Sequence, residues 1–460
     1  MKSLILGVLL VFAGGAARPD LNGHITTNDA RPISGATAYV DTAGVKSGTS
    51  PFCPSCYPDC GKLAVSNAAG DFTIPSLNPE LKFRLVFVAD GYKPASLTNV
   101  DPAAGIPIAI SLDRIPAQSD PTQTLRGRVV GPDGKPVPRA IVTPEGCQTA
   151  DKRWWGSMPG VDPMAVTNDR GEFILTSDHP AIAFDVKVEA RALATQRFAL
   201  LPLGQPSHDL QLHEGATVIG RLMLDGKPLA GVNVGLVQAD RGVEVFTGPR
   251  KLATDADGRF TFVNIAPHGQ WIVYGAMEDL LTRGSIKAQT LRVGEDGTTT
   301  DAGDLSTGPA HTLRGRVLLS DGHAIPMGTR LILDRETAWD SQTVILDKAG
   351  QFTFTGLPPE SISLALMMRG YRFSMANHSL DRLNLTCLIG AIDGDIDDLT
   401  ILMEPGQWTG EDIKAWIDLA RPKPGPVMAA DEQKSRESYQ RYRNLKTTRI
   451  QGVKPEPTPE

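Results

Sequence analysis

The sequence predicts an all-β protein made of four tandem antiparallel β-sandwiches. Two short signatures occur four times each at nearly the same spacing, and repetition of a pattern at a fixed period indicates repeated domains. The 460 residues also include 46 glycines and 35 prolines, a composition that suits many short strands joined by turns. Each repeat therefore corresponds to one small sandwich.

The first signature is a six-residue turn of the form Asn/Asp-x-x-Gly-x-Phe. An Asn or Asp side chain accepts hydrogen bonds from backbone N–H groups further along the turn, and glycine takes a positive φ without a clash. The Phe begins an alternating run that places aromatic rings on one face of a strand. We therefore expect a hairpin at each copy. The copies are residues 67–72, 168–173, 255–260 and 347–352.

The second signature is a glycine inside an apolar strand start, followed by a turn and then by a proline. Asp-Gly dipeptides favour hairpin turns, and proline marks a strand edge or the entry to the next strand. Successive copies of both signatures lie about 90 to 100 residues apart, so the two markers count the same four units. The strand-start glycines are Gly23, Gly127, Gly220 and Gly315.

Alternating strands and short connections give the domain limits. Strands that close a unit are predicted at residues 108–112, 210–212 and 399–403, and less clearly around 304–305. The connections between units are short, so we expect neighbouring sandwiches to touch. The predicted organisation is a secretory segment (1–17), four sandwiches (18–115, 124–213, 214–306 and 309–405) and a short helical, partly disordered tail (406–460).

The first 17 residues have the features of a secretory signal peptide. Lys2 is followed by an apolar stretch and by small residues at 14–17, which form a cleavage zone before Arg18. No later stretch reaches the roughly 20 apolar residues of a membrane helix. A net charge of −6 argues against general nucleic-acid binding, which needs a basic surface. We expect an exported protein, periplasmic or extracellular, without a transmembrane segment.

The order of glycine strand, Asp-Gly-Lys-Pro turn and Asn/Asp-x-x-Gly-x-Phe hairpin resembles the carboxypeptidase regulatory-like domain, a transthyretin-like sandwich. The chain is also similar to a family of secreted bacterial multi-domain proteins. The strings that carry this second resemblance are FCPSCYPDCG at 52–61, GVDP at 160–163 and AWDSQT at 338–343. The resemblance implies a transthyretin-like or Ig-like fold and export, and an accessory, adhesive or polysaccharide-contacting role.

Three cysteines lie close together in the first unit, in a C-x₂-C-x₃-C arrangement of Cys53, Cys56 and Cys60. In an exported protein such a group predicts a disulfide that staples the insertion, with a leftover thiol or a bond to Cys147. Three thiolates could instead supply most of a tetrahedral zinc shell, with Cys147 or His24 as the fourth ligand. Thiol redox chemistry is a third interpretation.

Alternating carboxylates in the fourth unit follow a pattern typical of calcium loops, which collect several oxygens from one turn. They are Asp393, Asp395 and Asp397. The segment lacks the glycine and the distant Glu of an EF-hand and continues directly into a strand. A plain acidic turn is the alternative prediction.

Tryptophans in connecting segments are the other candidate contacts. Trp154 and Trp155 lie in a long connection of the second unit, and Trp339 lies in a connection of the fourth. Exposed aromatic rings can stack on sugar rings or on partner side chains, and the alternative is that they fill a seam between domains.

No catalytic motif of a zinc peptidase or serine hydrolase is found, and four small sandwiches offer no obvious catalytic scaffold. The sequence therefore favours a non-enzymatic binding or scaffold protein of the cell envelope that contacts polysaccharide or an envelope protein through its loops. The rival hypothesis is a metal- or thiol-dependent redox protein centred on Cys53, Cys56 and Cys60.

Overall fold

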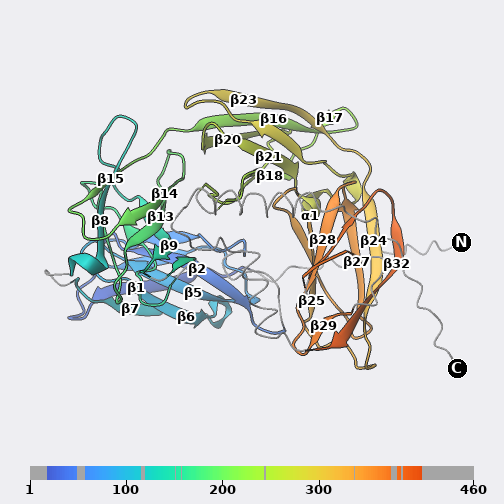
Figure 1. Ribbon diagram of the computed structural model, residues 1–460, viewed down its shortest axis with the longest axis horizontal. Coiled ribbons are helices and arrows are strands. Elements are labelled where there is room, and N and C mark those ends of the chain that lie inside the picture. The colour runs from blue at the N-terminus through green and yellow to red at the C-terminus, as the bar shows by residue number, and fades with distance from the viewer. Residues whose placement is uncertain are drawn as a thin grey trace, which may run out of the picture. The chain divides into compact units, whose positions relative to one another are not determined.

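The computed structural model describes nine segments of the chain. They are residues 18–48, 57–115, 120–150, 152–156, 158–242, 245–335, 337–374, 381–384 and 387–406. The predicted signal peptide and the predicted tail from residue 407 lie outside them. Strands dominate the described part and form eight sheets, which pair into four sandwiches as the sequence predicts (Figure 1). The first sandwich forms one compact unit and the other three form a second.

The first sandwich contains sheets of strand order β4-β1-β7 and β3-β2-β5-β6. Its strands are β1 (Leu21–Thr27), β2 (Thr37–Val45), β3 (Leu63–Val65), β4 (Asp71–Ile74), β5 (Leu81–Val88), β6 (Ala95–Val100) and β7 (Ile108–Leu112), with a 3₁₀ turn at Pro102–Ala104.

The second sandwich contains sheets of order β12-β8-β15 and β10-β9-β13-β14, with β11 also paired to β9. A 3₁₀ turn at Pro121–Gln123 precedes it. Its strands are β8 (Thr124–Val130), β9 (Ile141–Gln148), β10 (Arg153–Trp155), β11 (Ala165–Val166), β12 (Glu172–Thr176), β13 (Ala183–Glu189), β14 (Gln196–Pro202) and β15 (His208–Gln211).

The third sandwich contains sheets of order β17-β16-β20, with β23 paired to β16, and β19-β18-β21-β22. Its strands are β16 (Ala216–Leu224), β17 (Lys227–Pro228), β18 (Asn233–Gln238), β19 (Arg250–Ala253), β20 (Arg259–Ile265), β21 (Gln270–Gly275), β22 (Gln289–Arg292) and β23 (Thr299–Ser306). A short helix α1 (Met277–Leu280) and a 3₁₀ turn (Leu281–Arg283) follow β21.

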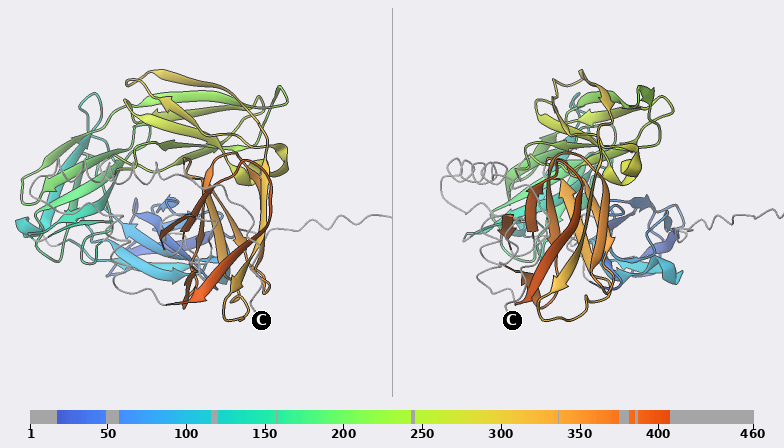
Figure 2. Two further views of the ribbon diagram at one scale, coloured as in Figure 1. Left: turned by 45° about the vertical axis from the view of Figure 1, so that its right-hand side comes forward. Right: turned by 90° about the vertical axis from the view of Figure 1, so that its right-hand side faces the viewer.

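The fourth sandwich contains sheets of order β27-β24-β32-β29 and β26-β25-β28-β31-β30, and its two layers are seen in both views of Figure 2. Its strands are β24 (His311–Leu319), β25 (Arg330–Arg335), β26 (Ser341–Ile345), β27 (Gln351–Leu357), β28 (Ser361–Leu366), β29 (Tyr371–Phe373), β30 (Asp381–Asn384), β31 (Cys387–Ala391) and β32 (Ile396–Pro405).

The two repeated signatures turn out to be halves of one packing unit. In every sandwich the strand-start glycine lies directly opposite the Phe of the six-residue turn signature: Gly23 faces Phe72, Gly127 faces Phe173, Gly220 faces Phe260 and Gly315 faces Phe352. The ring lies across its glycine, since a Cβ built on Gly220 would be only 2.4 Å from the Phe260 ring. The glycine is therefore needed because a side chain there would displace the aromatic ring from the core.

The six-residue turns follow the predicted chemistry. In the second copy, the Asn168 side-chain oxygen accepts hydrogen bonds from the backbone N–H groups of Arg170 at 2.9 Å and Glu172 at 3.0 Å. Gly171 has a φ of 74°, in the left-handed region that glycine tolerates. The structure thus confirms the turn and the burial of Phe173 in the core, but the predicted hairpin is wrong. The strands on either side, β11 and β12, belong to different sheets, so the turn carries the chain from one layer of the sandwich to the other.

One detail of the sheets differs from the antiparallel prediction. The first and last strands of every sandwich pair in parallel: β1 with β7, β8 with β15, β16 with β23, and β24 with β32. Parallel strands need a long crossover, and here the other strands of the domain provide it. Alternation of apolar residues alone cannot reveal strand direction, because it is the same in both arrangements.

Candidate functional site

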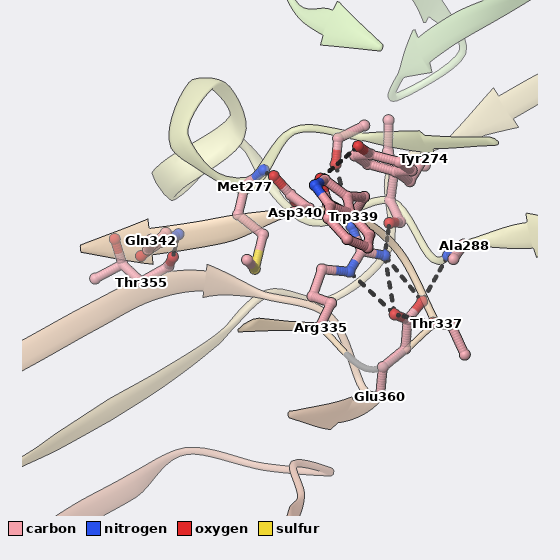
Figure 3. Close-up of polar contacts among 12 residues, drawn as sticks. Tyr274, Met277, Ala288, Arg335, Thr337, Trp339, Asp340, Gln342, Thr355 and Glu360 are labelled. Atoms are coloured by element: carbon pink, nitrogen blue, oxygen red, sulfur yellow. Dashed lines mark hydrogen bonds and ion pairs between the residues drawn. The ribbon is translucent and has the colours of Figure 1, made fainter. Parts of the chain in front are cut away.

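A group of charged and aromatic side chains lies where the third sandwich meets the fourth (Figure 3), and its charged members are buried whereas Trp339 at its edge is 39% exposed. We call this contact the joint. Its members from the third sandwich are Tyr274, Gly275, Met277, Ile286 and Ala288, and its members from the fourth are Arg335, Thr337, Trp339, Asp340 and Glu360.

The ends of strands place these residues together. Arg335 is the last residue of β25, Asp340 precedes β26, and Glu360 precedes β28, so all three lie at one end of the same sheet of the fourth sandwich. On the other side of the joint, β21 ends at Gly275 and the chain turns into α1. Polar backbone groups of the third sandwich thereby face charged side chains of the fourth.

Arg335 is the centre of the joint, and its side chain has no exposed surface. Its Nε donates to Glu360 at 3.0 Å, and its Nη2 donates to the same carboxylate at 2.9 Å. Its Nη1 donates to Asp340 at 3.3 Å. The guanidinium also donates to two carbonyl oxygens of the third sandwich, those of Gly275 at 3.2 Å and Ile286 at 3.0 Å. These contacts use every donor position of the guanidinium.

The two carboxylates also reach back to the third sandwich. Glu360 accepts a hydrogen bond from the backbone N–H of Ala288, and Asp340 accepts one from the N–H of Met277 at 3.0 Å. Thr337 donates its hydroxyl to Glu360 at 3.2 Å. Charged side chains of one sandwich therefore pair with backbone groups of the other that the contact removes from water.

Aromatic side chains cover the charged group. Tyr274 lies flat over Gly235, where a Cβ would be 2.0 Å from its ring, and its hydroxyl donates to the Trp339 carbonyl oxygen at 2.6 Å. Burial raises the pKa of Tyr274, so the phenol remains a donor at neutral pH. The Trp339 ring packs on Phe246 with centroids 5.1 Å apart and on the guanidinium of Arg241 at 5.0 Å.

Helix α1 contributes one side chain to each of two cores. Met277 is almost fully buried and belongs to the hydrophobic core of the fourth sandwich, although it is part of the chain segment of the third. Leu280, three residues later, belongs to the core of the third. Because these two side chains enter different cores, α1 packs between the sandwiches and connects their cores.

Asp340 makes the stability of the joint depend on pH. Burial raises the pKa of its carboxyl, although the nearby Arg335 acts in the opposite direction. Among the described residues, its Oδ1 has no hydrogen-bond partner. The folded protein therefore holds the proton of Asp340 more tightly than the unfolded chain does. The resulting gain in the free energy of unfolding is complete below about pH 3.9, the unperturbed pKa of Asp, and is lost as the pH rises through the pKa of the folded protein.

We expect an Asp340→Asn variant to gain stability relative to the wild-type protein as the pH rises from about 4 to about 7, because the amide never ionises. Urea unfolding of both proteins across this range measures the difference. Asp304→Asn is a control, since hydrogen bonding to Arg221 lowers the pKa of Asp304, and its contribution is complete above about pH 3.9 and so stays nearly constant over this range. A difference between wild type and Asp340→Asn that stays constant with pH contradicts the expectation.

The tryptophans of the second sandwich lie in β10, an edge strand. Lys152 places its ammonium group 3.8 Å from the centre of the Trp154 ring, and Arg153 lies 4.3 Å from that of Trp155. Both rings are half-buried. Trp155 also lines a small pocket with the charged side chains of Asp185 and Arg197. The predicted contact residues Trp154 and Trp155 thus lie in the second sandwich, and Trp339 lies in the joint.

The cysteines are only partly described. Cys53 and Cys56 lie outside the described residues, so the predicted staple or metal site stays a prediction. Cys60 packs against the core of the first sandwich. Cys147 is buried in the core of the second, where desolvation raises the pKa of its thiol. Such an environment disfavours the thiolate form that binds metal or attacks a disulfide.

The acidic turn of the fourth sandwich faces its first strand. Asp395 accepts a hydrogen bond from the backbone N–H of Thr312 at 2.8 Å, and Asp397 pairs with Arg314 at 2.8 Å. In the described part of the chain, no group of three His, Cys, Asp or Glu side chains is placed to hold a metal ion. Asp395 and Asp397 are thus both engaged by the first strand of the sandwich, and the calcium site stays a prediction.

The sequence did not point to Arg335, Glu360, Tyr274 or α1. The string AWDSQT at residues 338–343 was the one available signal, because it carries Trp339 and Asp340 and does not repeat in the other sandwiches. An arginine ending an apolar strand gives no sign from sequence that it faces another domain.

Comparisons with known proteins give no family for this chain. No model of a known family matches it, and no curated protein does. Among solved structures, the Bacillus anthracis TIE protein matches 84% of this chain and 73% of its own at 10% identity, with a TM-score of 0.18. A streptococcal ancillary pilin matches 63% of this chain and 99% of its own at 10% identity, with a TM-score of 0.22.

GBS52, the minor pilin of Streptococcus agalactiae, matches 42% of this chain and 97% of its own at 15% identity, with a TM-score of 0.21. TM-scores this low carry no weight for the function of this chain. The resemblance to the carboxypeptidase regulatory-like family stays a prediction, whereas the sandwich fold that it implies is confirmed by the sheets.

Among the described helices, none has the length and apolar character needed to cross a membrane.

Proposed function

We propose that this protein is an exported, non-catalytic scaffold of the cell envelope that holds contact surfaces on an array of sandwiches. The observation that carries the proposal is the bonding of Arg335, whose donors are all occupied by the protein's own acceptors. A guanidinium that binds a substrate needs donors directed toward an open space. The joint instead uses its charges to hold two domains together.

The contact surface in this proposal includes Trp154 and Trp155, which present half-buried rings beside Lys152 and Arg153 at a sheet edge. Aromatic rings flanked by cations suit stacking on sugar rings and on the side chains of a protein partner. Polysaccharide or an envelope protein is the partner that we propose. Trp154 and Trp155 are the one pair of adjacent tryptophans in the sequence, so β10 supplies a feature that the repeated framework does not.

Binding by the mature protein tests the proposal. We expect residues 18–460 to retain a glycan on an array or to recover an envelope protein in a pull-down, and the double variant Trp154→Ala, Trp155→Ala to lose that binding. Ile106→Ala is a matched control, because this apolar residue is 72% exposed and belongs to the first sandwich rather than to β10. If neither assay shows binding, or if both variants behave alike, the proposal is wrong.

A further inference from the structure

The connection between the second and third sandwiches is built differently from the joint. Only residues 212–215 separate β15 from β16. Asp296 of the third sandwich holds this connection by accepting from the backbone N–H of Gly215 at 2.9 Å and by pairing with His213 at 2.9 Å. The two paired side chains are 49% and 41% exposed, so water competes for this contact.

Two further side chains link these sandwiches. Asn264 donates from its amide to the carbonyl oxygens of Ala192 at 2.9 Å and Glu214 at 2.8 Å. Arg250 donates to the Thr195 hydroxyl at 2.9 Å. All of these contacts are polar hydrogen bonds, which exchange readily for bonds to water and add little net stability each.

Apolar burial is what distinguishes the two connections. In the described part of the chain, no hydrophobic cluster combines residues of the second and third sandwiches. At the joint, by contrast, Met277 belongs to the core of the fourth sandwich, and Ala338 of the fourth belongs to a cluster with Tyr274 of the third. Domains joined by a small polar contact are expected to move relative to each other, whereas a buried apolar contact restrains them.

The backbone at the polar connection is also unusual. Gly215 has a φ of 90°, and Asn264 and Ala192 take left-handed values of 56° and 62°, although neither is glycine. A Cβ on Gly215 would lie 2.7 Å from the carbonyl carbon of Asn264, so the connection crosses directly over this residue. Hinges typically consist of a few residues at the ends of strands or helices that absorb large changes in φ and ψ. Residues with strained φ and ψ keep them only while the surrounding contacts hold them in place.

We propose that residues 213–215 are a hinge, and that the third and fourth sandwiches move about it as one body fixed by the joint. The His213–Asp296 pair and the hydrogen bonds of the Asn264 amide act as clasps, meaning contacts that favour one orientation of the second sandwich relative to the third. Movement there changes where the second sandwich, with Trp154 and Trp155, stands relative to the other two. The inference does not depend on what the tryptophans bind.

Single-molecule energy transfer in the mature full-length protein tests this inference. Dyes are attached through p-azidophenylalanine introduced at exposed turn positions of the second, third and fourth sandwiches. The positions are those of Lys135, Asp257 and His323. We expect a broader distance distribution between positions 135 and 257, across the hinge, than between positions 257 and 323, across the joint. Equally narrow or equally broad distributions for the two pairs overturn the proposal.

Substitutions at the hinge sharpen the test. Gly215→Ala is expected to shift and broaden the 135–257 distribution and to leave the 257–323 distribution unchanged, because its Cβ would collide with Asn264. Gly226→Ala is a matched control, since Gly226 also has a positive φ in the third sandwich but has open space around its Cβ position. Asp296→Ala removes a clasp without adding an atom and should broaden the same pair. An unchanged 135–257 distribution in both hinge variants contradicts the proposal.

Discussion

Replacing Arg335 with alanine is expected to lower the free energy of unfolding of the third and fourth sandwiches by about 3–5 kcal/mol. The substitution leaves the carboxylates of Asp340 and Glu360 buried without their counter-charge, and both are almost inaccessible to water. It also removes the donors that pair with the carbonyl oxygens of Gly275 and Ile286. Losing one partner of a buried charged pair costs more than the pair itself contributes, because the remaining charge stays desolvated.

Hydrogen exchange measured by mass spectrometry across a urea series is suited to this test, since a multi-domain protein does not unfold in a single two-state step. Peptides from β18 and β21 report on the third sandwich, and peptides from β25 and β28 report on the fourth. We expect both sets to lose protection together. Arg221→Ala is the control, because its pair with Asp304 lies at the surface and should have a much smaller effect. Equal losses for Arg335→Ala and Arg221→Ala contradict the expectation.

Replacing Arg335, Asp340 and Glu360 together with apolar residues is not expected to give a stable joint. Such replacements are often harmless where buried charges bond only to one another. Here the charged side chains also pair with four backbone groups of the third sandwich, namely the carbonyls of Gly275 and Ile286 and the N–H groups of Met277 and Ala288. These groups would remain buried and unpaired, so the ionic character of the joint follows from the backbone that it covers.

The repeated part of the fold could be predicted because its chemistry is local. The turn at residues 168–173 needs an Asn side chain, a glycine with positive φ and a Phe, and all three lie within six residues. The pairing of Gly127 with Phe173 was not visible in the same way, because their contact depends on the register between strands far apart in sequence. The two signatures nevertheless repeat with the same period, as expected for residues that pack together in every unit.

The joint could not be predicted, because its contacts link segments far apart in the sequence. The alternation of apolar residues and the turn motifs describe each segment only by itself. Arg335 and Ile286 are 49 residues apart, and nothing in either local sequence indicates that a guanidinium meets that carbonyl. Trp339 shows the limit most clearly. Its position in a connection predicted an exposed contact or an interdomain seam, and only the packing of Phe246 and Arg241 against its ring places it at the joint.

Replacing Met277 with alanine is the second substitution with a large expected effect. A buried methionine cut back to alanine costs about 2–5 kcal/mol, because the apolar contacts are lost and a cavity remains. The cavity would open in the core of the fourth sandwich, in the cluster that also includes Leu313 and Phe354, although Met277 follows a strand of the third. We therefore expect peptides from β24 and β27 to lose protection in Met277→Ala.

Leu280→Ala provides the matched comparison, since Leu280 is equally buried on the same short helix but packs in the core of the third sandwich. If α1 connects the two cores, each variant destabilises both sandwiches, because a loss in either core weakens the helix that the other core needs. Protection lost only in the third sandwich for both variants would show that the fourth folds without the helix. A shared loss would mean that residues 216–405 unfold as one cooperative body, which is what a scaffold needs on the rigid side of a hinge.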